Sequence, residues 1–305
     1  MSRIHDALLK AERERRGEAP PPAIEDVVPP MPEPEAAPVA AVGVAEEPAP
    51  SPATGMPSEP AGVAALLARA KATAWKPNQK AVLPAEAGRV VPGIEEFRTL
   101  RSRLYQLRSQ GPLKVVLIAS AMPGEGKSFV AVNLAHIFVR QRGRRVLLID
   151  GDLRWPRLHE ALGTPATPGL AECLRGEADV MAALQRGPGD ALFFLPGGAA
   201  GPNPAEIIAN GRLKGIMEQL RPLFDWIVID TPAAVPISDA NILANYCDGV
   251  VLVVRAGETP FDLARKAREE FQHKPVLGAV LNRVKAGATY SSYYYKGYKV
   301  DEPKG

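Results

Sequence analysis

The sequence predicts an α/β domain, doubly wound around a mostly parallel sheet with helices on both faces. Short runs rich in Val, Ile and Leu recur from residue 114 to residue 282: KVVLIAS, RVLLID, LFFLP, WIVID, GVVLVV and LGAVLN. Segments with the period of a helix lie between several of them, namely SFVAVNLAHIFVR, RLKGIMEQLRPL and FDLARKAREEFQ. Nearly continuous apolar strands indicate a sheet that is covered on both faces, and their alternation with helices indicates parallel connections. Because ligands bind such sheets at the carboxyl ends of the strands, the residues after each run are candidate site residues.

The first sixty residues differ in composition from the rest of the chain. Residues 17–60 hold 13 of the 31 prolines and eight acidic residues, but no Lys, Arg or aromatic residue. Such a segment cannot bury enough apolar surface to offset its ordering entropy, which predicts a disordered linker rich in Pro, Ala and Glu. Residues 1–16 have apolar side chains at helical spacing and predict a short amphipathic helix, either a docking peptide for another protein or a start without a role. We therefore expect a helix at 1–16, a linker at 17–60, a folded domain at 61–286 and a C-terminal tail at 287–305, with further helices at 62–73 and 94–107.

Charge, hydropathy and cysteine content exclude several classes of function. The net charge of +3 is the sum of +2 in residues 1–16, −8 in residues 17–60 and +9 in residues 61–305. No run of Lys and Arg with interleaved aromatic residues occurs, so we expect no nucleic-acid partner. No apolar run approaches the ~18–20 residues of a membrane span and the start lacks a signal-peptide core, which predicts a cytoplasmic protein. The two cysteines, Cys173 and Cys247, lack CxxC spacing, so a zinc site is not expected.

The first predicted strand is followed by a glycine-rich loop, AMPGEGKS at 121–128, and then by a helical run. A strand, a glycine loop, Gly-Lys-Ser and a helix form a P-loop, in which backbone N–H groups and a helix N-terminus surround a polyphosphate. Lys127 would reach the β- and γ-phosphates of ATP, and Ser128 would hold Mg²⁺. Ala121 stands where the usual pattern begins with glycine, and the alternative is a chance Gly-rich turn. The expected nucleotide-binding residues are Met122, Pro123, Gly124, Glu125, Gly126, Lys127, Ser128 and Phe129.

Acidic residues close two further strands. Asp150 and Asp152 follow RVLLI, where they could hold a metal ion or accept a proton, although a pair of helix-capping residues is the alternative. Asp230 ends WIVID, where a buried carboxylate would be costly without a cation nearby. An acidic residue at this position of a P-loop domain orients Mg²⁺.

Together, these strand ends resemble the Walker A, A′ and B motifs of the bacterial tyrosine kinases, the autokinases of polysaccharide export. The A motif is PGEGKS at 123–128, the A′ motif is DGDLR at 150–154 and the B motif is DTP at 230–232. Glu95, Arg98 and Arg101 match the family's ExxRxxR helix before the P-loop. PNPAE at 202–206, SDA at 238–240 and LNR at 281–283 also agree, so the resemblance extends over about residues 92–298.

The wider class of P-loop NTPases also includes the Min and Par partition ATPases. Those proteins resemble this chain in the A′ and B strands but carry a second lysine in the loop, KGGxGK, where this chain has Met122 and Pro123. This difference disfavours a role in positioning chromosomes or plasmids. A Min/Par-type ATPase switch without tyrosine kinase activity remains the alternative function, and a nucleotide-binding scaffold that transfers nothing is a third.

Five of the seven tyrosines lie close together near the C-terminus. Composition alone leaves open an aromatic tail that only packs against the domain. Beside a kinase-like P-loop, we interpret these residues as phosphoacceptors for autophosphorylation. They are Tyr290, Tyr293, Tyr294, Tyr295 and Tyr298.

The resemblance also implies a mechanism and partners. Lys127, Asp150, Asp152 and Asp230 would be catalytic, Ser128, Asp152 and Asp230 would hold Mg²⁺, and Asp152 would accept the tyrosine proton. The resemblance implies a ring-shaped homo-oligomer in which a neighbouring subunit phosphorylates the tail. It also implies that the subunit contact contains Glu95, Arg98 and Arg101, although an ion pair within the helix is the alternative for Glu95. A transmembrane polysaccharide co-polymerase would act as adaptor and hold the kinase at the inner face of the cell membrane, where it would regulate polymerisation and export. A phosphotyrosine phosphatase would reverse the modification.

Overall fold

The computed structural model describes residues 68–83, 93–141, 143–189 and 191–284. The expected helix at 1–16, the linker at 17–60 and the tyrosine-rich tail at 287–305 lie outside the described residues. The described residues all belong to one compact unit of the chain, Pro57–Gly305.

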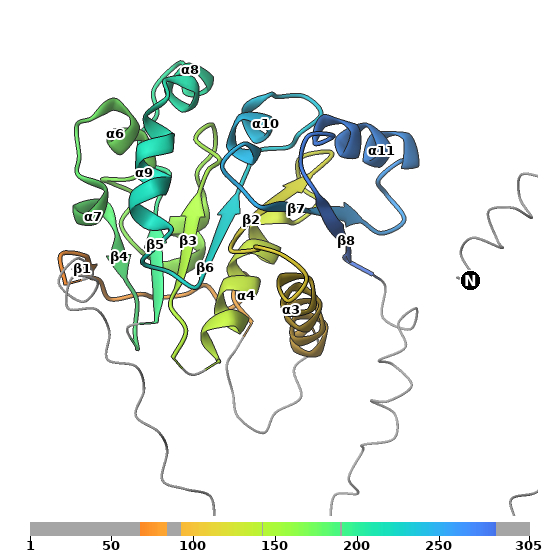
Figure 1. Cartoon of the computed structure of the whole chain (residues 1–305), viewed down its shortest axis with the longest axis horizontal. Coiled ribbons are helices and arrows are strands. Elements are labelled where there is room, and N and C mark those ends of the chain that lie inside the picture. The colour runs from red at the N-terminus through yellow and green to blue at the C-terminus, as the bar shows by residue number, and fades with distance from the viewer. Residues whose placement is uncertain (1–67, 84–92, 142, 190, 285–305) are drawn as a thin grey trace, which may run out of the picture. The chain divides into compact units, whose positions relative to one another are not determined.

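A mostly parallel sheet forms the centre of the described domain (Figure 1). Its eight strands have the order β1-β4-β5-β3-β6-β2-β7-β8. Neighbouring strands are parallel except β4 and β5, which are antiparallel. The strands are β1 Lys71–Ala72, β2 Val115–Ser120, β3 Val146–Asp150, β4 Gln185–Arg186, β5 Leu192–Leu195, β6 Trp226–Asp230, β7 Gly249–Arg255 and β8 Val276–Asn282.

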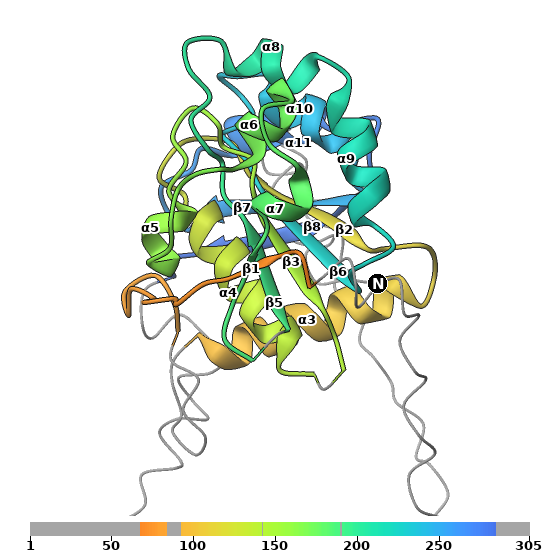
Figure 2. The ribbon, with the colours of Figure 1, turned by 90° about the vertical axis from the view of Figure 1, so that its left-hand side faces the viewer.

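Helices cover both faces of this sheet, as the sequence predicts. One hydrophobic cluster joins α3, α4 and α5 to the sheet, and a second joins α6 through α11 to the opposite face. Figure 2 shows α4 and α5 on the other side of the strands from α9. The helices are α3 Ile94–Arg108, α4 Lys127–Val139, α5 Leu158–Leu162, α6 Leu170–Arg175, α7 Val180–Ala183, α8 Pro204–Ala209, α9 Arg212–Leu220, α10 Asp239–Ala244 and α11 Phe261–Glu270.

Alternation along each strand explains why the apolar runs are continuous. Side chains at successive positions of a strand point to opposite faces. In β2, Val115, Leu117 and Ala119 belong to one core cluster, whereas Val116 and Ile118 belong to the other. Both faces are therefore buried, and all six predicted strands are confirmed.

The prediction of a helix at 62–73 is wrong for its described end. Lys71 and Ala72 form the short strand β1, which pairs in parallel with β4. The backbone N–H of Lys71 donates to Leu184 O and that of Thr73 donates to Arg186 O. These bonds to a distant segment override the local helical pattern. The helix predicted at 94–107 is confirmed as α3.

An aromatic cluster around Trp226 connects α3, α4 and β6. The Trp226 ring stacks on Phe138 of α4 with centroids 4.3 Å apart. Its Nε1 donates to the Tyr105 hydroxyl of α3 at 3.0 Å, and the Arg108 guanidinium lies 4.9 Å from its ring centroid. Trp226 is fully buried, so this cluster fixes the position of β6 against both helices.

No helix among the described residues is long and apolar enough to cross a bilayer.

Candidate active site

The loop between β2 and α4 has the backbone conformation of a phosphate-binding loop. Gly124 and Gly126 have φ angles of 82° and 98°, a left-handed conformation that favours glycine. Lys127 is the first residue of α4, a helix of 13 residues. The N-terminus of such a helix presents unpaired N–H groups and the positive end of its dipole to an anion. These features fit the polyphosphate site that the sequence predicts.

The buried side chain of Glu125 stabilises this loop by hydrogen bonds. Its carboxylate is 2% exposed and accepts hydrogen bonds from the Met122 N–H, at 2.7 Å, and from the Thr259 hydroxyl. From the end of β8, Asn282 Nδ2 donates to the Glu125 carbonyl at 2.8 Å. Glu125 thus contributes to the nucleotide site through the shape of the loop, which its carboxylate and carbonyl contacts maintain.

Strand register brings Asp150 and Asp230 side by side. The two residues end neighbouring strands and are direct partners in the β3–β6 pair. Trp226 and Val228 point to the face covered by α4, and alternation places Asp230 on that same face. Leu148 belongs to the same cluster, so alternation along β3 places Asp150 on this face as well. Both carboxylates are consequently buried beside the start of α4, where Lys127 lies.

Asp150 holds the loop that follows β3. Its carboxylate accepts hydrogen bonds from the backbone N–H groups of Asp152, at 3.3 Å, and Leu158, at 3.0 Å. Burial, followed by the charge of Asp230, raises the pKa of Asp150 well above its usual range. Because it is fully buried and engaged with the backbone, Asp150 is poorly suited to meet a substrate.

Asp230 has the properties of a cation ligand. Burial raises its pKa to about 6, whereas the charge of Lys127 and a hydrogen bond from Ser128 act in the opposite direction. Its Oδ1 atom is buried without a hydrogen-bond partner among the described residues. An unsatisfied buried carboxylate oxygen is costly, and a hydrated Mg²⁺ would satisfy it. The residues at this point therefore fit a divalent cation.

Asp152 is the carboxylate of this group that solvent can reach. It is partly exposed, and burial raises its pKa while the charge of Lys127 lowers it. One of its oxygens, Oδ1, accepts the Trp155 N–H at 3.1 Å. A partly exposed carboxylate near Lys127 fits a base that acts on a group arriving from solvent.

A salt bridge connects the loop after β3 to the segment after β6. Arg154 Nε and Nη2 donate to the two carboxylate oxygens of Asp239 at 2.8 and 3.1 Å. Asp239 is fully buried, and Arg154 is the only cation paired with it in the described part of the chain. The forked pair ties the loop that carries Asp152 to the first residue of α10.

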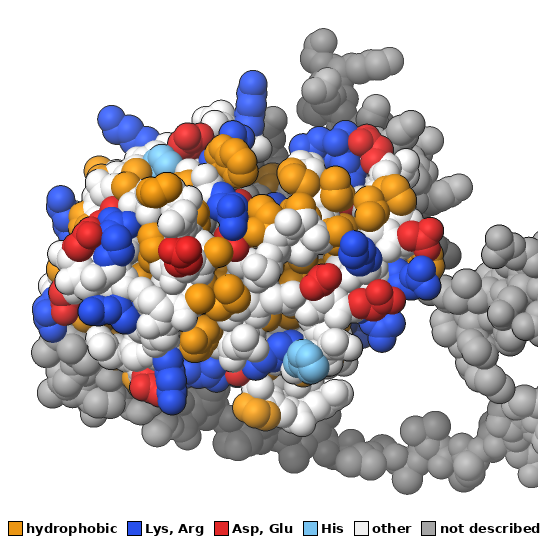
Figure 3. Space-filling model, turned by 90° about the horizontal axis from the view of Figure 1, so that it is seen from above, with side chains coloured by type: hydrophobic (Ala, Val, Ile, Leu, Met, Phe, Trp, Pro, Cys, Tyr) orange, Lys and Arg blue, Asp and Glu red, His pale blue; other side chains and the backbone are white. Residues whose placement is uncertain are grey.

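The described residues contain no group of three His, Cys, Asp or Glu side chains arranged to hold a metal ion. A Mg²⁺ ion at Asp230 would therefore depend on the Ser128 hydroxyl, on water and on nucleotide phosphates, as is usual for this ion. Seen from above, the face above the carboxyl ends of the strands mixes hydrophobic, basic and acidic side chains (Figure 3).

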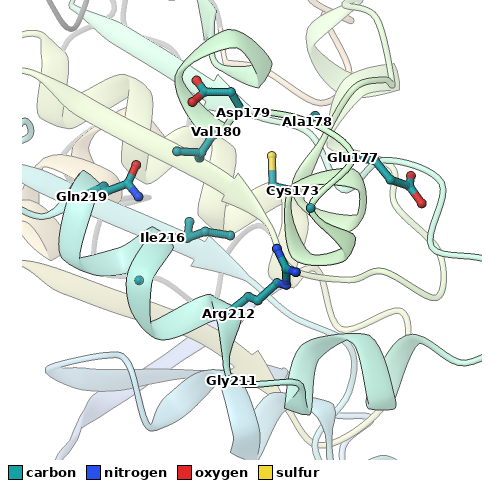
Figure 4. A pocket seen from close by; sticks show the side chains of 11 residues that line it. Cys173, Glu177, Ala178, Asp179, Val180, Gly211, Arg212, Ile216 and Gln219 are labelled. Carbon is teal, nitrogen blue, oxygen red and sulfur yellow. The ribbon is translucent and has the colours of Figure 1, made fainter.

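A separate surface cleft of about 580 Å³ lies between the α6–α7 connection and α9, and it contains none of the predicted site residues. In Figure 4, the Arg212 side chain and the Cys173 thiol point toward its centre, whereas the carboxylate of Glu177 points away. Burial raises the pKa of Cys173 to about 12, so the thiol is protonated at neutral pH. This cleft has no group suited to nucleophilic chemistry.

Comparisons with known proteins agree with this geometry. The family model of the CobQ/CobB/MinD/ParA nucleotide binding domain matches residues 116–296. Tyrosine-protein kinase YwqD of Bacillus subtilis is 38% identical over 207 residues, which cover 67% of this chain and 86% of the relative. This chain belongs to the bacterial tyrosine kinase family.

Two further similar proteins show how the extent of the match varies. The crystal structure of the chimerical protein CapA2B2 superposes with a TM-score of 0.63 at 27% identity, covering 73% of this chain and 98% of that one. The succinoglycan biosynthesis transport protein ExoP of Rhizobium meliloti is 35% identical over 194 residues, but the match covers 25% of its length. The matched region therefore makes up most of some relatives and only a quarter of a much longer one.

The ExxRxxR residues of this family member lie on α3, away from the strand ends. Glu95 forms an ion pair with Arg98 on the same helix, and both side chains are about half exposed. Arg101 donates to the Ile137 carbonyl of α4 at 3.0 Å. The structure thus brings the P-loop and the three acidic residues together, and it leaves Glu95 and Arg98 at the surface.

Sequence reasoning missed the contacts that hold the loops in place. Thr259 and Asn282 reach Glu125 across 134 and 157 positions of the chain, and Arg154 reaches Asp239 across 85. The family motifs LNR and SDA marked two of these residues without giving their partners. Thr259 had no signal beyond its place just before a predicted helix.

Proposed function

We propose that this chain is an ATP-dependent protein-tyrosine autokinase whose acceptors are Tyr290, Tyr293, Tyr294, Tyr295 and Tyr298. The observation that carries the proposal is the partly exposed carboxylate of Asp152, which follows β3 and feels the charge of Lys127 at the start of the P-loop helix. A base at this point serves an acceptor hydroxyl that arrives from outside the domain. The name of the relative YwqD, a tyrosine-protein kinase, supports the same reaction.

The residues divide the reaction between them. The loop amides and Lys127 hold the β- and γ-phosphates, and the neighbouring positive charge stabilises the charge that develops during transfer. Asp152 accepts the phenol proton as the tyrosine oxygen forms its bond to the γ-phosphorus. The bond from that phosphorus to the bridging oxygen breaks, so ADP leaves and the proton remains on the carboxylate until solvent takes it. Asp150 keeps the Asp152 loop in place through its two backbone contacts.

Mg²⁺ is the expected companion of ATP at this site. Ser128 and Asp230 would hold it, with Asp152 close to its water shell, and the free Oδ1 atom of Asp230 supports this assignment. When bound, the ion neutralises charge on the β- and γ-phosphates.

Chain length allows the tail to reach either its own site or that of a neighbour. Tyr290 lies eight residues after Asn282, the end of β8, and can extend about 26 Å from it. Four strand spacings separate β8 from β3, which amounts to about 19 Å. Transfer between subunits of a ring, with Glu95, Arg98 and Arg101 at the contact, is therefore part of the proposal and needs its own test.

A mixing experiment tests activity and route together. One full-length protein carries Lys127→Met and serves only as acceptor; the other has its five tail tyrosines changed to Phe and serves only as kinase. With Mg-ATP, we expect phosphotyrosine in the mixture and in neither protein alone. Phosphotyrosine in the unmodified protein but not in the mixture would indicate transfer within one chain. ATP hydrolysis without phosphotyrosine in any sample would favour the Min/Par-type switch.

The cellular role follows from the relatives as a proposal. ExoP is named a transport protein of succinoglycan biosynthesis, and this supports a role in polysaccharide polymerisation and export. We propose that a transmembrane co-polymerase recruits this chain to the inner face of the membrane and that residues 1–16 contribute to the contact. We also propose that a phosphotyrosine phosphatase removes the phosphate from the tail. Loss of membrane association on deletion of the co-polymerase, measured by cell fractionation, would support this role.

A further inference from the structure

Trp155 is a large aromatic side chain placed in solvent beside the candidate base. It is 67% exposed, whereas Trp75 and Trp226, the other tryptophans, are buried in the core. None of the ring contacts in the described ranges involves Trp155. An indole in this position does not contribute to the core, and exposed aromatic residues of this kind are enriched where proteins bind partners.

The backbone that carries Trp155 is held at both ends. Its own N–H donates to Asp152 at 3.1 Å, and Asp150 accepts the N–H groups of Asp152 and Leu158 on either side. Pro156 follows directly and restricts the backbone of Trp155. The backbone of Trp155 is therefore held close to the Asp152 carboxylate, and its exposed indole starts from that point.

Trp155 lies on the side of the site where the acceptor tyrosine is expected to enter. The carboxylates lie at the ends of β3 and β6, on one side of the P-loop strand β2, whereas Thr259 and Asn282 lie on the side of β7 and β8. Since the transferred phosphoryl group must be next to Asp152, the rest of the nucleotide extends away from it. Trp155 is therefore on the side from which the acceptor enters.

We propose that Trp155 positions the acceptor tyrosine, with its indole packed against the phenol ring that enters toward Asp152. The partner is the aromatic side chain of the tail cluster, Tyr290 to Tyr298, and the inference rests on the proposed kinase function. Aromatic pairs of this kind are favourable beyond the area that they bury. Trp155 acts through substrate position and takes no part in proton or phosphoryl transfer.

The test separates acceptor binding from nucleotide binding. The full-length kinase, with its five tail tyrosines changed to Ser, phosphorylates a peptide of residues 287–300. Trp155→Ala should raise KM for the peptide about tenfold and leave KM for ATP within about twofold, and Trp155→Phe should restore most of the loss. Phe261→Ala is the matched control, because Phe261 is also an exposed aromatic residue, 78% exposed, but lies at the start of α11. An unchanged peptide KM for Trp155→Ala, or an equal rise for Phe261→Ala, would overturn the inference.

A binding measurement keeps this result distinct from a failure of the kinase function. Trp155 is the exposed tryptophan of the three, so its fluorescence should shift to shorter wavelength when the peptide binds in the presence of a non-hydrolysable ATP analogue. The shift should vanish in Trp155→Phe and with a peptide in which every Tyr is Ser. If the unmodified protein makes no phosphotyrosine but the shift occurs, the kinase proposal fails and the contact of Trp155 with the tail stands. Absence of the shift in an active kinase removes the Trp155 inference alone.

Discussion

Replacing Asp230 with Asn should stabilise the nucleotide-free protein at neutral pH while abolishing its activity. The buried Asp230 has a pKa of about 6 in the folded protein, compared with 3.8 for an unperturbed Asp. A carboxyl whose pKa is raised on folding opposes folding when it is ionised. At about 1.4 kcal/mol for each pH unit, the difference corresponds to about 3 kcal/mol at pH 7.

The sign of the pH dependence is specific. As pH falls through about 6, folded Asp230 takes up a proton that the unfolded chain, with its pKa of 3.8, does not yet bind. The stabilising effect of Asp230→Asn should therefore be nearly complete at pH 7, decrease as the pH falls below about 6, and disappear below the unfolded-state pKa of 3.8. Urea unfolding of both proteins across this range, in a chelator and without nucleotide, measures the difference.

Two additions make this test decisive. Asp262→Asn serves as the control, because the side chain of Asp262 is 83% exposed and its removal should leave stability unchanged. Mg-ATP should reverse the ranking, since a ligand that binds only the carboxylate form stabilises the unmodified protein. If Asp230→Asn lowers the free energy of unfolding at pH 7, or shifts it equally at every pH, the argument from burial is refuted.

Two further predictions concern the loops around the site. Gly151→Ala should lower the free energy of unfolding in urea by several kcal/mol, because the new Cβ would lie 2.6 Å from the Asp230 carbonyl. Gly215→Ala, which has open space in α9, should instead stabilise the protein by about 0.5–1 kcal/mol. Equal effects of the two substitutions would contradict the steric argument. In the salt bridge, Arg154→Ala should cost about 2–4 kcal/mol because it leaves the buried Asp239 uncompensated, and Asp239→Asn should cost less because the freed Arg154 can reach water. A larger loss for Asp239→Asn in the same assay would mean that the aspartate is not the buried partner of the pair.

The sheet and the position of the site could be predicted because both depend on local pattern. Continuous apolar runs such as WIVID require two covered faces, and parallel strands bring their carboxyl ends, and with them Asp150 and Asp230, to one edge. The strand β1 could not be predicted, since its two residues gain their conformation from pairing with β4. The hydrogen bond from Thr259 to Glu125 could not be predicted either, because contacts between segments far apart in the chain leave no periodic pattern in the sequence.

The stacking of Trp226 has a mechanical consequence for the reaction. Trp226 begins the strand that Asp230 ends, and its ring is held by Phe138 near the end of the P-loop helix and by Tyr105 of α3. A shift of α3 would therefore act, through the Trp226 ring, on the strand that ends at Asp230 and on the helix that begins at Lys127. Because both elements meet the same ring, a force on the outer helix α3 would reach Lys127 and Asp230, which interact electrostatically, through one contact point.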